Sequence, residues 1–209
     1  MLNILTSALR ISLVTWVLCG LIYPLAVTAL AQTVFPAQAN GSLVTAADGT
    51  VQGSALIGQQ WSDPEWFHGR PSATTDTDPN DSTKTIAAPY NAASSGGSNY
   101  AATSQALADR LAADRKALEE AEPGLAGKAL PSDMLTTSAS GLDPDISPAN
   151  AALQVARVAA ARHVPEDRVQ ALVQDQVVGR DLGVFGEPRV NVLALNLALD
   201  KAFPARPAR

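Results

Sequence analysis

Thiols and aromatic side chains are scarce in this sequence. Cys19 is the only cysteine in 209 residues, which excludes a disulfide framework and a cysteine-ligated metal site. It lies in an apolar N-terminal run, so the rest of the chain has no thiol, as suits an oxidising compartment. Aromatic residues make up 5% and hydrophobic residues 46%, many of them alanine. Because alanine is the best helix former, we expect a small-residue core that is partly helical.

Positive charge is also limited. The sequence has 15 Lys and Arg against 20 Asp and Glu, a net charge of −5. Nucleic-acid binding needs a surplus of Lys and Arg on one face, so we exclude a nucleic-acid partner. A chain of this length can bury a real core and is expected to form one main domain.

Charge is missing altogether between Arg10 and Asp48. The most apolar part, residues 11–35, is longer than the roughly 20 residues that cross a bilayer as a helix. Pro24 lies in its middle, where lipid tolerates a proline at the cost of a kink. We therefore predict a transmembrane helix over residues 11–35, preceded by a short tail of residues 1–10.

The charges that flank this span predict its direction. Arg10 and the α-amino group precede it, whereas the next basic residue after it is Arg70. The positive-inside rule then makes the tail cytoplasmic and residues 36–209 an extracytoplasmic soluble domain. The rival interpretation is a cleaved signal peptide, because residues 29–31 read Ala-Leu-Ala. The apolar run is longer than a usual signal sequence, which favours a retained anchor, and both interpretations leave the domain on the same side.

The soluble domain changes character along its length. Turn formers dominate its first part, with a hairpin turn at Asp48-Gly49, a short buried strand at 55–58 and a long polar loop at 76–99. Helices are predicted over 101–122, 148–162 and 165–179. Residues 190–203 begin like a strand and finish like a helix. Short strands followed by helices predict an α+β fold.

Neither a metal site nor a catalytic residue is predicted. Asp76, Asp78 and Asn80 have the alternating spacing of a calcium loop, but Asp81 and Ala87 occupy the positions of its glycine and glutamate. A solvated loop is therefore the better interpretation. A Ser-His-Asp triad is not indicated either, because no nucleophile-elbow sequence is present.

A run of small residues, Ser94 to Asn99, is the most suggestive feature for ligand binding. Backbone N–H groups in such a run can converge on an anion, and a helix starting near Ala101 would add the positive end of its dipole. No lysine accompanies the run, so it is not a P-loop. On spacing alone, a tight loop that caps the next helix is favoured over a phosphate site.

The segment from Trp61 to Pro71 is rich in aromatic residues and punctuated by proline. Within it, Trp66, Phe67 and Arg70 mark either a subunit interface or a structural corner of the domain. The two hypotheses predict different effects of substitution, namely loss of assembly or loss of thermal stability.

Six ordered motifs resemble the C subunit of the Kdp potassium-transporting P-type ATPase. They are GSALIGQ at 53–59, WFHGRPSA at 66–73, YN at 90–91 with SGGSN at 95–99, TSASGLDP at 137–144 with ISP at 146–148, Gln154 with RVA at 157–159, and GEPRVNV at 186–192 with LNLALD at 195–200. The resemblance covers nearly the whole chain, anchor included. Two departures are Asp145, where the family often has histidine, and a loop around residues 76–88 that looks longer than usual.

The resemblance implies an accessory subunit without chemistry or a tightly bound cofactor of its own, in a high-affinity complex of the bacterial inner membrane. Its implied partners are a potassium-channel-like subunit, a P-type ATPase subunit that hydrolyses ATP, and a very small accessory subunit. The family's C subunit is described as a catalytic chaperone that raises nucleotide affinity. Its small-residue stretch is likened to the signature loop of ABC transporters, which implies ATP contact at Ser95, Gly96, Gly97 and Ser98.

The predicted topology conflicts with direct ATP contact, because it leaves residues 95–98 outside the membrane, where there is essentially no ATP. A competing hypothesis is that the domain docks on the outer face of the potassium-selecting subunit and stabilises the complex. Its acidic surface could raise the local cation concentration over about 8–10 Å. A third hypothesis is an independent membrane-anchored periplasmic binding domain, which would bind a small ligand without any partner.

Overall fold

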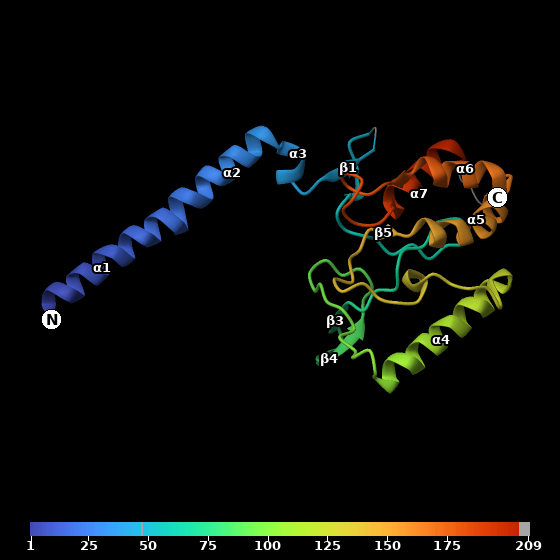
Figure 1. Cartoon of the computed structure of the whole chain (residues 1–209), viewed down its shortest axis with the longest axis horizontal. Coiled ribbons are helices and arrows are strands. Elements are labelled where there is room, and N and C mark those ends of the chain that lie inside the picture. The colour runs from blue at the N-terminus through green and yellow to red at the C-terminus, as the bar shows by residue number, and fades with distance from the viewer. Residues whose placement is uncertain (47, 205–209) are drawn as a thin grey trace. The chain divides into compact units, whose positions relative to one another are not determined.

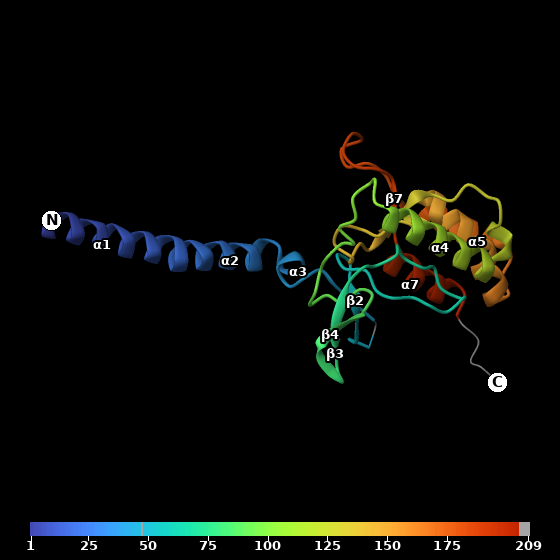
Figure 2. The same cartoon turned by 90° about the horizontal axis from the view of Figure 1, so that it is seen from below.

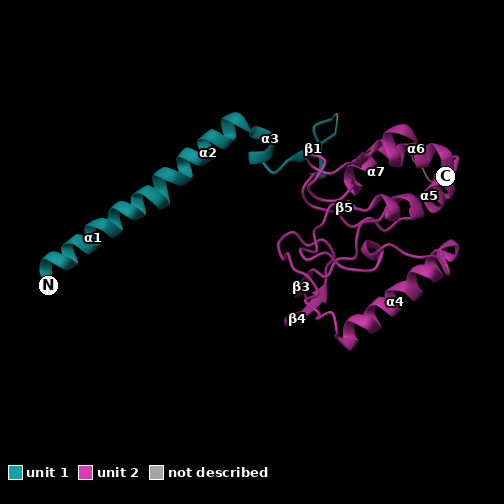
Figure 3. Cartoon of the chain, in the orientation of Figure 1, with its two compact units in different colours: residues 1–54 teal, residues 55–209 magenta. Residues whose placement is uncertain are grey.

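A computed structural model describes residues 1–46 and 48–204, in two compact units of residues 1–54 and 55–209 (Figure 3). The first unit is dominated by one long apolar helix, composed of α1 (Leu2–Val17), a π-helical turn η1 (Leu18–Ile22) and α2 (Tyr23–Val34) (Figure 1). The short helix α3 (Pro36–Ala39) follows. The span Leu2–Val34 has a mean hydropathy of 2.0 and no buried residue, and is long enough to cross a membrane.

The observed helix differs from the predicted one at its N-terminal end. It begins at Leu2 rather than near residue 11, so most of the predicted tail is helical. The disruption predicted at Pro24 takes the form of η1, which directly precedes α2. Proline has no N–H group to donate to the preceding turn, and a π-helical turn is one way for a helix to adjust its hydrogen bonds.

The predicted hairpin turn at Asp48-Gly49 is confirmed. Strands β1 (Leu43–Thr45) and β2 (Val51–Ser54) pair antiparallel. The Asp48 Oδ1 atom accepts hydrogen bonds from the Thr50 N–H at 2.9 Å and the Thr50 hydroxyl at 2.6 Å. Gly49 has φ +84°, a conformation that glycine adopts without strain.

Two predictions for the start of the second unit are wrong. Residues 55–58 do not form a buried strand: residues 55 and 56 form a turn, Ile57 makes only a single bridge, and Leu56 remains 63% exposed. Residues 76–99 are only partly a loop, because β3 (Thr75–Asp78) and β4 (Asp81–Ala87) form an antiparallel hairpin. Its threonine-rich strands suit β-structure. Its turn is held by Asp78 Oδ1, which accepts from the Asn80 N–H at 2.8 Å.

The rest of the second unit contains the larger helices and one small sheet. The helices are α4 (Gln105–Ala121), α5 (Pro148–Arg162), α6 (Glu166–Asp175) and α7 (Val192–Ala202), with 3₁₀ turns η2 (Pro123–Leu125) and η3 (Ser132–Met134). Strands β5 (Asp145–Ile146), β7 (Arg189–Asn191) and β6 (Val177–Val178) form an antiparallel sheet in that order. The predicted α+β class is confirmed.

The core lies where α5, α6 and α7 pack together beside β7 (Figures 1 and 2). Its fully buried side chains are mostly valine and leucine and include Val158, Val169, Val190, Leu195 and Leu199. The core is partly helical, as expected, but the expectation of an alanine-rich core is wrong, since Ala151 and Ala159 are the two alanines among the buried apolar residues that the structure describes. None of the residues of α4 is fully buried. The core therefore lies mainly among the C-terminal helices of this unit, and the half-buried leucines of α4 are not among the residues of the core cluster.

Helix boundaries match the sequence best where capping residues mark them. The Ser147 hydroxyl accepts from the Asn150 N–H at 3.1 Å and caps α5, as predicted. Asn191 caps α7 in the same way. The sequence of residues 190–203 left open where strand gives way to helix, and the structure places that change at Val192, between β7 and α7. In contrast, α4 begins at Gln105 rather than near 101, and α6 ends at Asp175, before β6.

Candidate functional site

An irregular segment, residues 61–74, crosses the core of the second unit, and amide side chains satisfy its buried backbone. Phe67 is fully buried. Its N–H donates to Asn196 Oδ1 at 2.9 Å, and Asn196 Nδ2 donates back to the Phe67 carbonyl at 3.0 Å. Gln154 binds both peptide groups of His68 in the same way, at 2.7 and 3.0 Å. These pairs replace the hydrogen bonds that a strand would supply.

Two arginines of α5 hold the start of the same segment. Arg157 Nη1 donates to the carbonyls of Pro64 at 2.7 Å and Trp66 at 2.9 Å, while its Nε pairs with Glu122 at 2.7 Å. Burial lowers the pKa of Arg157, and the nearby Glu122 carboxylate opposes that shift. The Arg162 guanidinium lies 4.2 Å from the Trp66 ring centroid, a cation–π contact.

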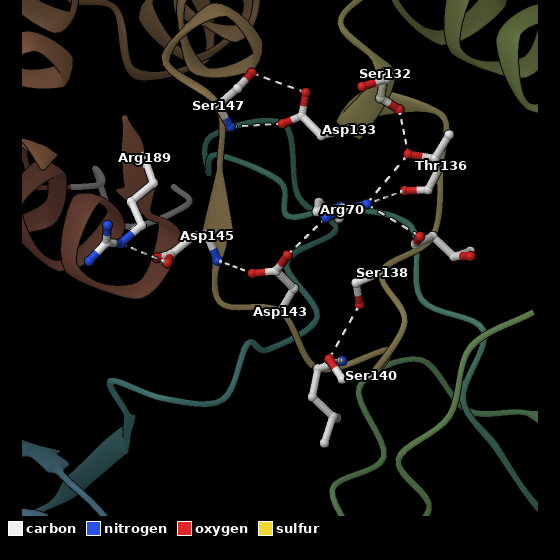
Figure 4. Close-up of polar contacts among 12 residues, drawn as sticks. Arg70, Ser132, Asp133, Thr136, Ser138, Ser140, Asp143, Asp145, Ser147 and Arg189 are labelled. Atoms are coloured by element: carbon white, nitrogen blue, oxygen red, sulfur yellow. Dashed lines mark hydrogen bonds and ion pairs between the residues drawn. The ribbon is translucent and has the colours of Figure 1, made fainter. Parts of the chain in front are cut away.

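Arg70 connects this segment to the loop that precedes β5 (Figure 4). Its Nη1 donates to Asp143 Oδ2 at 2.9 Å, and its Nη2 donates to the carbonyl of Thr137 at 3.3 Å. The Tyr90 hydroxyl donates to the Arg70 carbonyl at 2.7 Å. Burial, together with the Asp143 charge, raises the pKa of Tyr90 to about 12. Arg70 is therefore committed to contacts within the domain.

The small-residue loop, Ser95–Ser98, packs on the same loop before β5. The Gly96 N–H donates to the Ser140 carbonyl at 2.9 Å, and the Ser95 hydroxyl donates to that carbonyl at 3.0 Å. The Thr137 hydroxyl donates to Ser98 Oγ at 3.3 Å. A Cβ atom at Gly97 would lie only 2.9 Å from the Ala139 carbonyl oxygen. The glycine at 97 is thus required by a close backbone approach.

This geometry bears on the anion-binding hypothesis. One N–H group of the predicted nest, that of Gly96, already has a partner in the Ser140 carbonyl. The supporting helix starts at Gln105, so its positive end is seven residues after Ser98 in the chain. The expectation of a helix beginning directly behind the loop is wrong. The loop still lines a hollow of about 460 Å³ that also includes Arg110 and Asp114, which pair with each other at 2.7 Å.

The carboxylates of Asp145 and Asp133, near β5, are paired with groups of the same domain (Figure 4). Asp145 lies 3.5 Å from the Arg189 Nε atom, and burial raises its pKa. Asp133 accepts from both the N–H and the hydroxyl of Ser147, at 2.7 and 3.0 Å. Within residues 1–46 and 48–204, no group of three His, Cys, Asp or Glu side chains could hold a metal ion. Asp78, from the calcium-like spacing, instead accepts from its own turn.

This chain is similar to subunits of potassium-transporting ATPases. The sequence model of the family described as "K+-transporting ATPase, c chain" (KdpC) matches residues 5–201. The chain belongs to this family. A KdpC subunit of a potassium-transporting ATPase from Bradyrhizobium diazoefficiens is 59% identical over 97% of this chain and 98% of the relative. One from Methylobacterium nodulans is 57% identical over 96% of this chain and 98% of the relative. One from Methylorubrum extorquens is 55% identical over 95% of this chain and 97% of the relative.

In this member of the KdpC family, Thr137 links two of the predicted site residues, Arg70 and Ser98. Its carbonyl accepts from Arg70 and its hydroxyl donates to Ser98. Trp66 and Phe67 lie farther along the segment, against the helices, where Phe67 is buried and Trp66 half-buried. The structure places all three corner residues, Trp66, Phe67 and Arg70, in contacts within the domain.

The sequence reading missed the side chains that hold the corner in place, Asn196, Gln154, Arg157 and Arg162. Three of them stand in motifs that carry the family resemblance, at 154, 157 and 195–200. A signal was therefore available. Gln154 interrupts the apolar face of the predicted helix 148–162, and Asn196 interrupts the apolar segment 190–203. A buried polar group in such a place needs a partner.

Proposed function

We propose that this chain is a non-catalytic accessory subunit needed for assembly of a high-affinity, ATP-driven potassium uptake complex of the inner membrane. Its partners are the potassium-channel-like subunit, the ATP-hydrolysing subunit and the small accessory subunit. The chain holds no tightly bound cofactor. Membership of the K+-transporting ATPase c-chain family and the apolar helix Leu2–Val34 support this proposal.

This proposal has the chain influence the ATPase without binding ATP, and it rests on one observation: donors of the Ser95–Ser98 loop are already hydrogen-bonded within the domain. Both the Gly96 N–H and the Ser95 hydroxyl donate to one carbonyl, that of Ser140. A phosphate that used these donors would leave the Ser140 carbonyl without them, at the cost of a hydrogen bond. The loop therefore serves to fix residues 137–141, and any influence of this chain on ATP affinity is transmitted through the assembly.

A catalytic chaperone can act without touching ATP. If the chain binds more tightly to the form of the ATPase that has high nucleotide affinity, it raises that affinity by the same factor. Linkage is reciprocal, so saturating ATP must tighten the association of this chain with the rest of the complex. Measuring the dissociation constant of the chain with and without ATP tests the mechanism, and an ATP-independent constant would contradict it.

Photolabelling separates this mechanism from direct ATP contact. The complete complex is irradiated with a photoreactive ATP analogue, and the labelled peptides are identified. We expect label on the ATP-hydrolysing subunit and none on residues 95–98. Labelling of those residues would support direct ATP contact if unlabelled ATP competes with it and if the double variant Ser95→Ala, Ser98→Ala loses it.

The extracytoplasmic position of the domain is testable because the chain's only thiol, Cys19, lies in the long apolar helix and not in the domain. In a Cys19→Ser background, Lys84→Cys offers a side chain that is 70% exposed in the native protein. A membrane-impermeant maleimide applied to intact spheroplasts should label this cysteine. Labelling only after the membrane is opened would reverse the topology and make cytoplasmic ATP accessible to the domain.

The independent binding domain remains the second candidate because of one hollow of about 330 Å³. Its lining includes Trp61, His68, Arg70, Tyr90 and Gln154. A volume of this size suits a small molecule. This hypothesis predicts that the purified full chain binds a small ligand with no other subunit present, whereas the accessory-subunit proposal predicts that its activity needs the complex.

A further inference from the structure

The loop between β6 and β7 exposes three large apolar side chains together. Leu182 is 90% exposed, Val184 69% and Phe185 65%. We call these three residues the apolar tip. Figure 2 shows the loop projecting beyond β7, away from the helical core of its unit. The stem below the tip is also apolar, with Val177 36% and Val178 47% exposed. A soluble surface gains nothing from grouping such side chains in one place.

The tip is held in a defined shape by its own backbone. Asp181 and Phe185 exchange two hydrogen bonds, each 2.9 Å long. The Gly183 N–H donates to the Arg180 carbonyl at 3.1 Å, and the Val184 N–H donates to the Asp181 carbonyl at 3.2 Å. These four N–H groups therefore need no water. These four paired donors can enter an apolar environment without being left unsatisfied.

The charges at the base of the tip are neutralised in pairs. Arg180 pairs with Glu187 at 2.6 Å, and Arg189 Nη2 lies 3.5 Å from an Asp181 carboxylate oxygen. The two arginines and two acidic residues of this base give no net charge. Its rim is thus neutral, which suits insertion into a recess of similar polarity.

Leu182 has a backbone conformation that is unfavourable for leucine. Its φ is +55°, in the left-handed region that glycine and asparagine tolerate far better. Turn formation alone would favour one of those residues here. Leu182 therefore stabilises the isolated domain neither through its backbone, which is strained, nor through its side chain, which is 90% exposed. Strain at such a position indicates a functional demand on the side chain.

We propose that the apolar tip inserts into an apolar, neutrally rimmed recess on another protein subunit of the K+-transporting ATPase, and so provides the docking contact of this domain. The inference rests on the proposed accessory function and names the surface that carries it. A bilayer surface is the weaker alternative, because loops that insert there are accompanied by unpaired Lys or Arg, which anionic lipids attract. Here both arginines are paired.

The charge of the whole unit supports the same choice. Arg10 and Asp48 cancel within residues 1–54, so the net charge of −5 belongs to the second unit. An anionic lipid surface repels a domain of this charge. A protein recess imposes no such penalty when its rim is neutral.

Leu182→Asn tests the proposal without threatening the fold, because asparagine accepts the left-handed conformation. We expect its thermal midpoint to equal or exceed that of the parent chain. The full chain, tagged and co-expressed with the other subunits, should recover at least tenfold less of the complex when it carries Leu182→Asn. Leu56→Asn is the matched control, since Leu56 is a 63% exposed leucine of the same unit, and it should recover as much as the parent.

Photocrosslinking identifies the occupant. A photoreactive amino acid is placed at position 182 of the full chain, and the complex is irradiated in native membranes. A crosslink to a subunit of the K+-transporting ATPase supports the proposal. Adducts with lipid alone, a crosslink to a second copy of this chain, or no crosslink would each overturn it.

The co-expression experiment distinguishes failure of the tip proposal from failure of the proposed accessory function. If the parent chain recovers the complex and Leu182→Asn recovers it equally well, the tip is not the docking contact and the accessory function stands. If the parent chain recovers no other subunit, the accessory function itself fails, and the tip proposal fails with it.

Discussion

The side-chain amide of Asn196 and the backbone of Phe67 form a closed pair, although 129 residues separate them in the chain. Phe67 donates to Asn196 Oδ1 at 2.9 Å and accepts from Asn196 Nδ2 at 3.0 Å. Both residues are fully buried. Through this pair α7 fixes the irregular segment that carries Trp66 and Arg70, the residues predicted as a corner or an interface.

Asn196→Leu should destabilise the second unit severely. It leaves the Phe67 N–H and carbonyl buried without partners, at about 1–3 kcal/mol for each group, so we expect a loss of about 2–6 kcal/mol. Urea unfolding of the full chain in detergent, followed by tryptophan fluorescence, measures this loss. Asn80→Leu, in an exposed turn, is the control and should change the free energy of unfolding by less than about 0.5 kcal/mol.

The two glycines of the Ser95–Ser98 loop should respond differently to alanine. A Cβ atom at Gly97 would meet the Ala139 carbonyl oxygen at 2.9 Å, whereas a Cβ atom at Gly96 has no atom within 4 Å. Gly97→Ala should therefore lower stability by about 1–3 kcal/mol, and Gly96→Ala by much less.

The same two variants report on nucleotide binding. If the loop were an ATP site, both alanines would disturb the backbone that faces the nucleotide. We expect instead that Gly96→Ala leaves the ATP concentration for half-maximal ATPase activity of the complex unchanged. A shift of threefold or more in that concentration, with normal stability, would favour direct contact.

Arg162→Lys should weaken the contact between α5 and the crossing segment. The Arg162 side chain is 1% exposed, and its guanidinium donates to the carbonyls of Glu65 at 2.9 Å and Phe203 at 2.7 Å. Lysine lacks the planar fork that reaches both. We expect a loss of about 1–3 kcal/mol in unfolding free energy.

The control for this prediction is Arg115→Lys, where the arginine is 42% exposed and its contacts lie at the surface: a pair with Glu119 within α4 and a hydrogen bond to the Lys128 carbonyl at 3.0 Å. Such a surface pair contributes little, so the change should stay within about 0.5 kcal/mol. Equal effects at the two positions would show that Arg162 is not a structural clamp.

His68 should make the domain less stable as the pH falls. Burial, and then the nearby Arg157 charge, lowers the pKa of His68 from its ordinary value of 6.5, so the folded state favours neutral imidazole. The unfolded chain then binds the proton more readily, and stability present above pH 6.5 is lost as the pH falls through the lowered pKa. The Asp63 and Glu122 carboxylates also face this ring and moderate the shift.

His68→Gln checks the sign of this effect. Urea midpoints at pH 7.5, 6.5 and 5.5 should decline less steeply in this variant than in the parent chain. Carboxylates contribute the same slope to both proteins, so the difference isolates the histidine. An identical slope in the two proteins would contradict the assignment.

Elements marked by local chemistry could be predicted from the sequence. Ser147 followed by Pro148 marks the start of α5, and Asp48-Gly49 marks the first hairpin, because capping and turn preferences act within a few residues. The apolar run without charge predicted the long helix. The family resemblance added the transport role, which no single residue pattern here indicates.

The features that could not be predicted depend on contacts between residues far apart in the chain, or lack a distinctive local pattern. The path of the crossing segment requires Gln154 and Asn196, which lie 86 and 129 residues from their partners. The β3–β4 hairpin was missed because its strands are polar and its side chains mostly exposed, so no apolar alternation marked it. The late start of α4 was missed because Ala101 and Ala102 suit a helix as well as the observed turn.

We propose that this chain works only as part of a transport complex. The most direct test is to purify the tagged full chain from native membranes in mild detergent and to identify what accompanies it. We predict stoichiometric recovery of a P-type ATPase and a potassium-channel-like protein, with potassium-stimulated ATPase activity. A chain that purifies alone, from membranes shown to contain both proteins, would contradict the account.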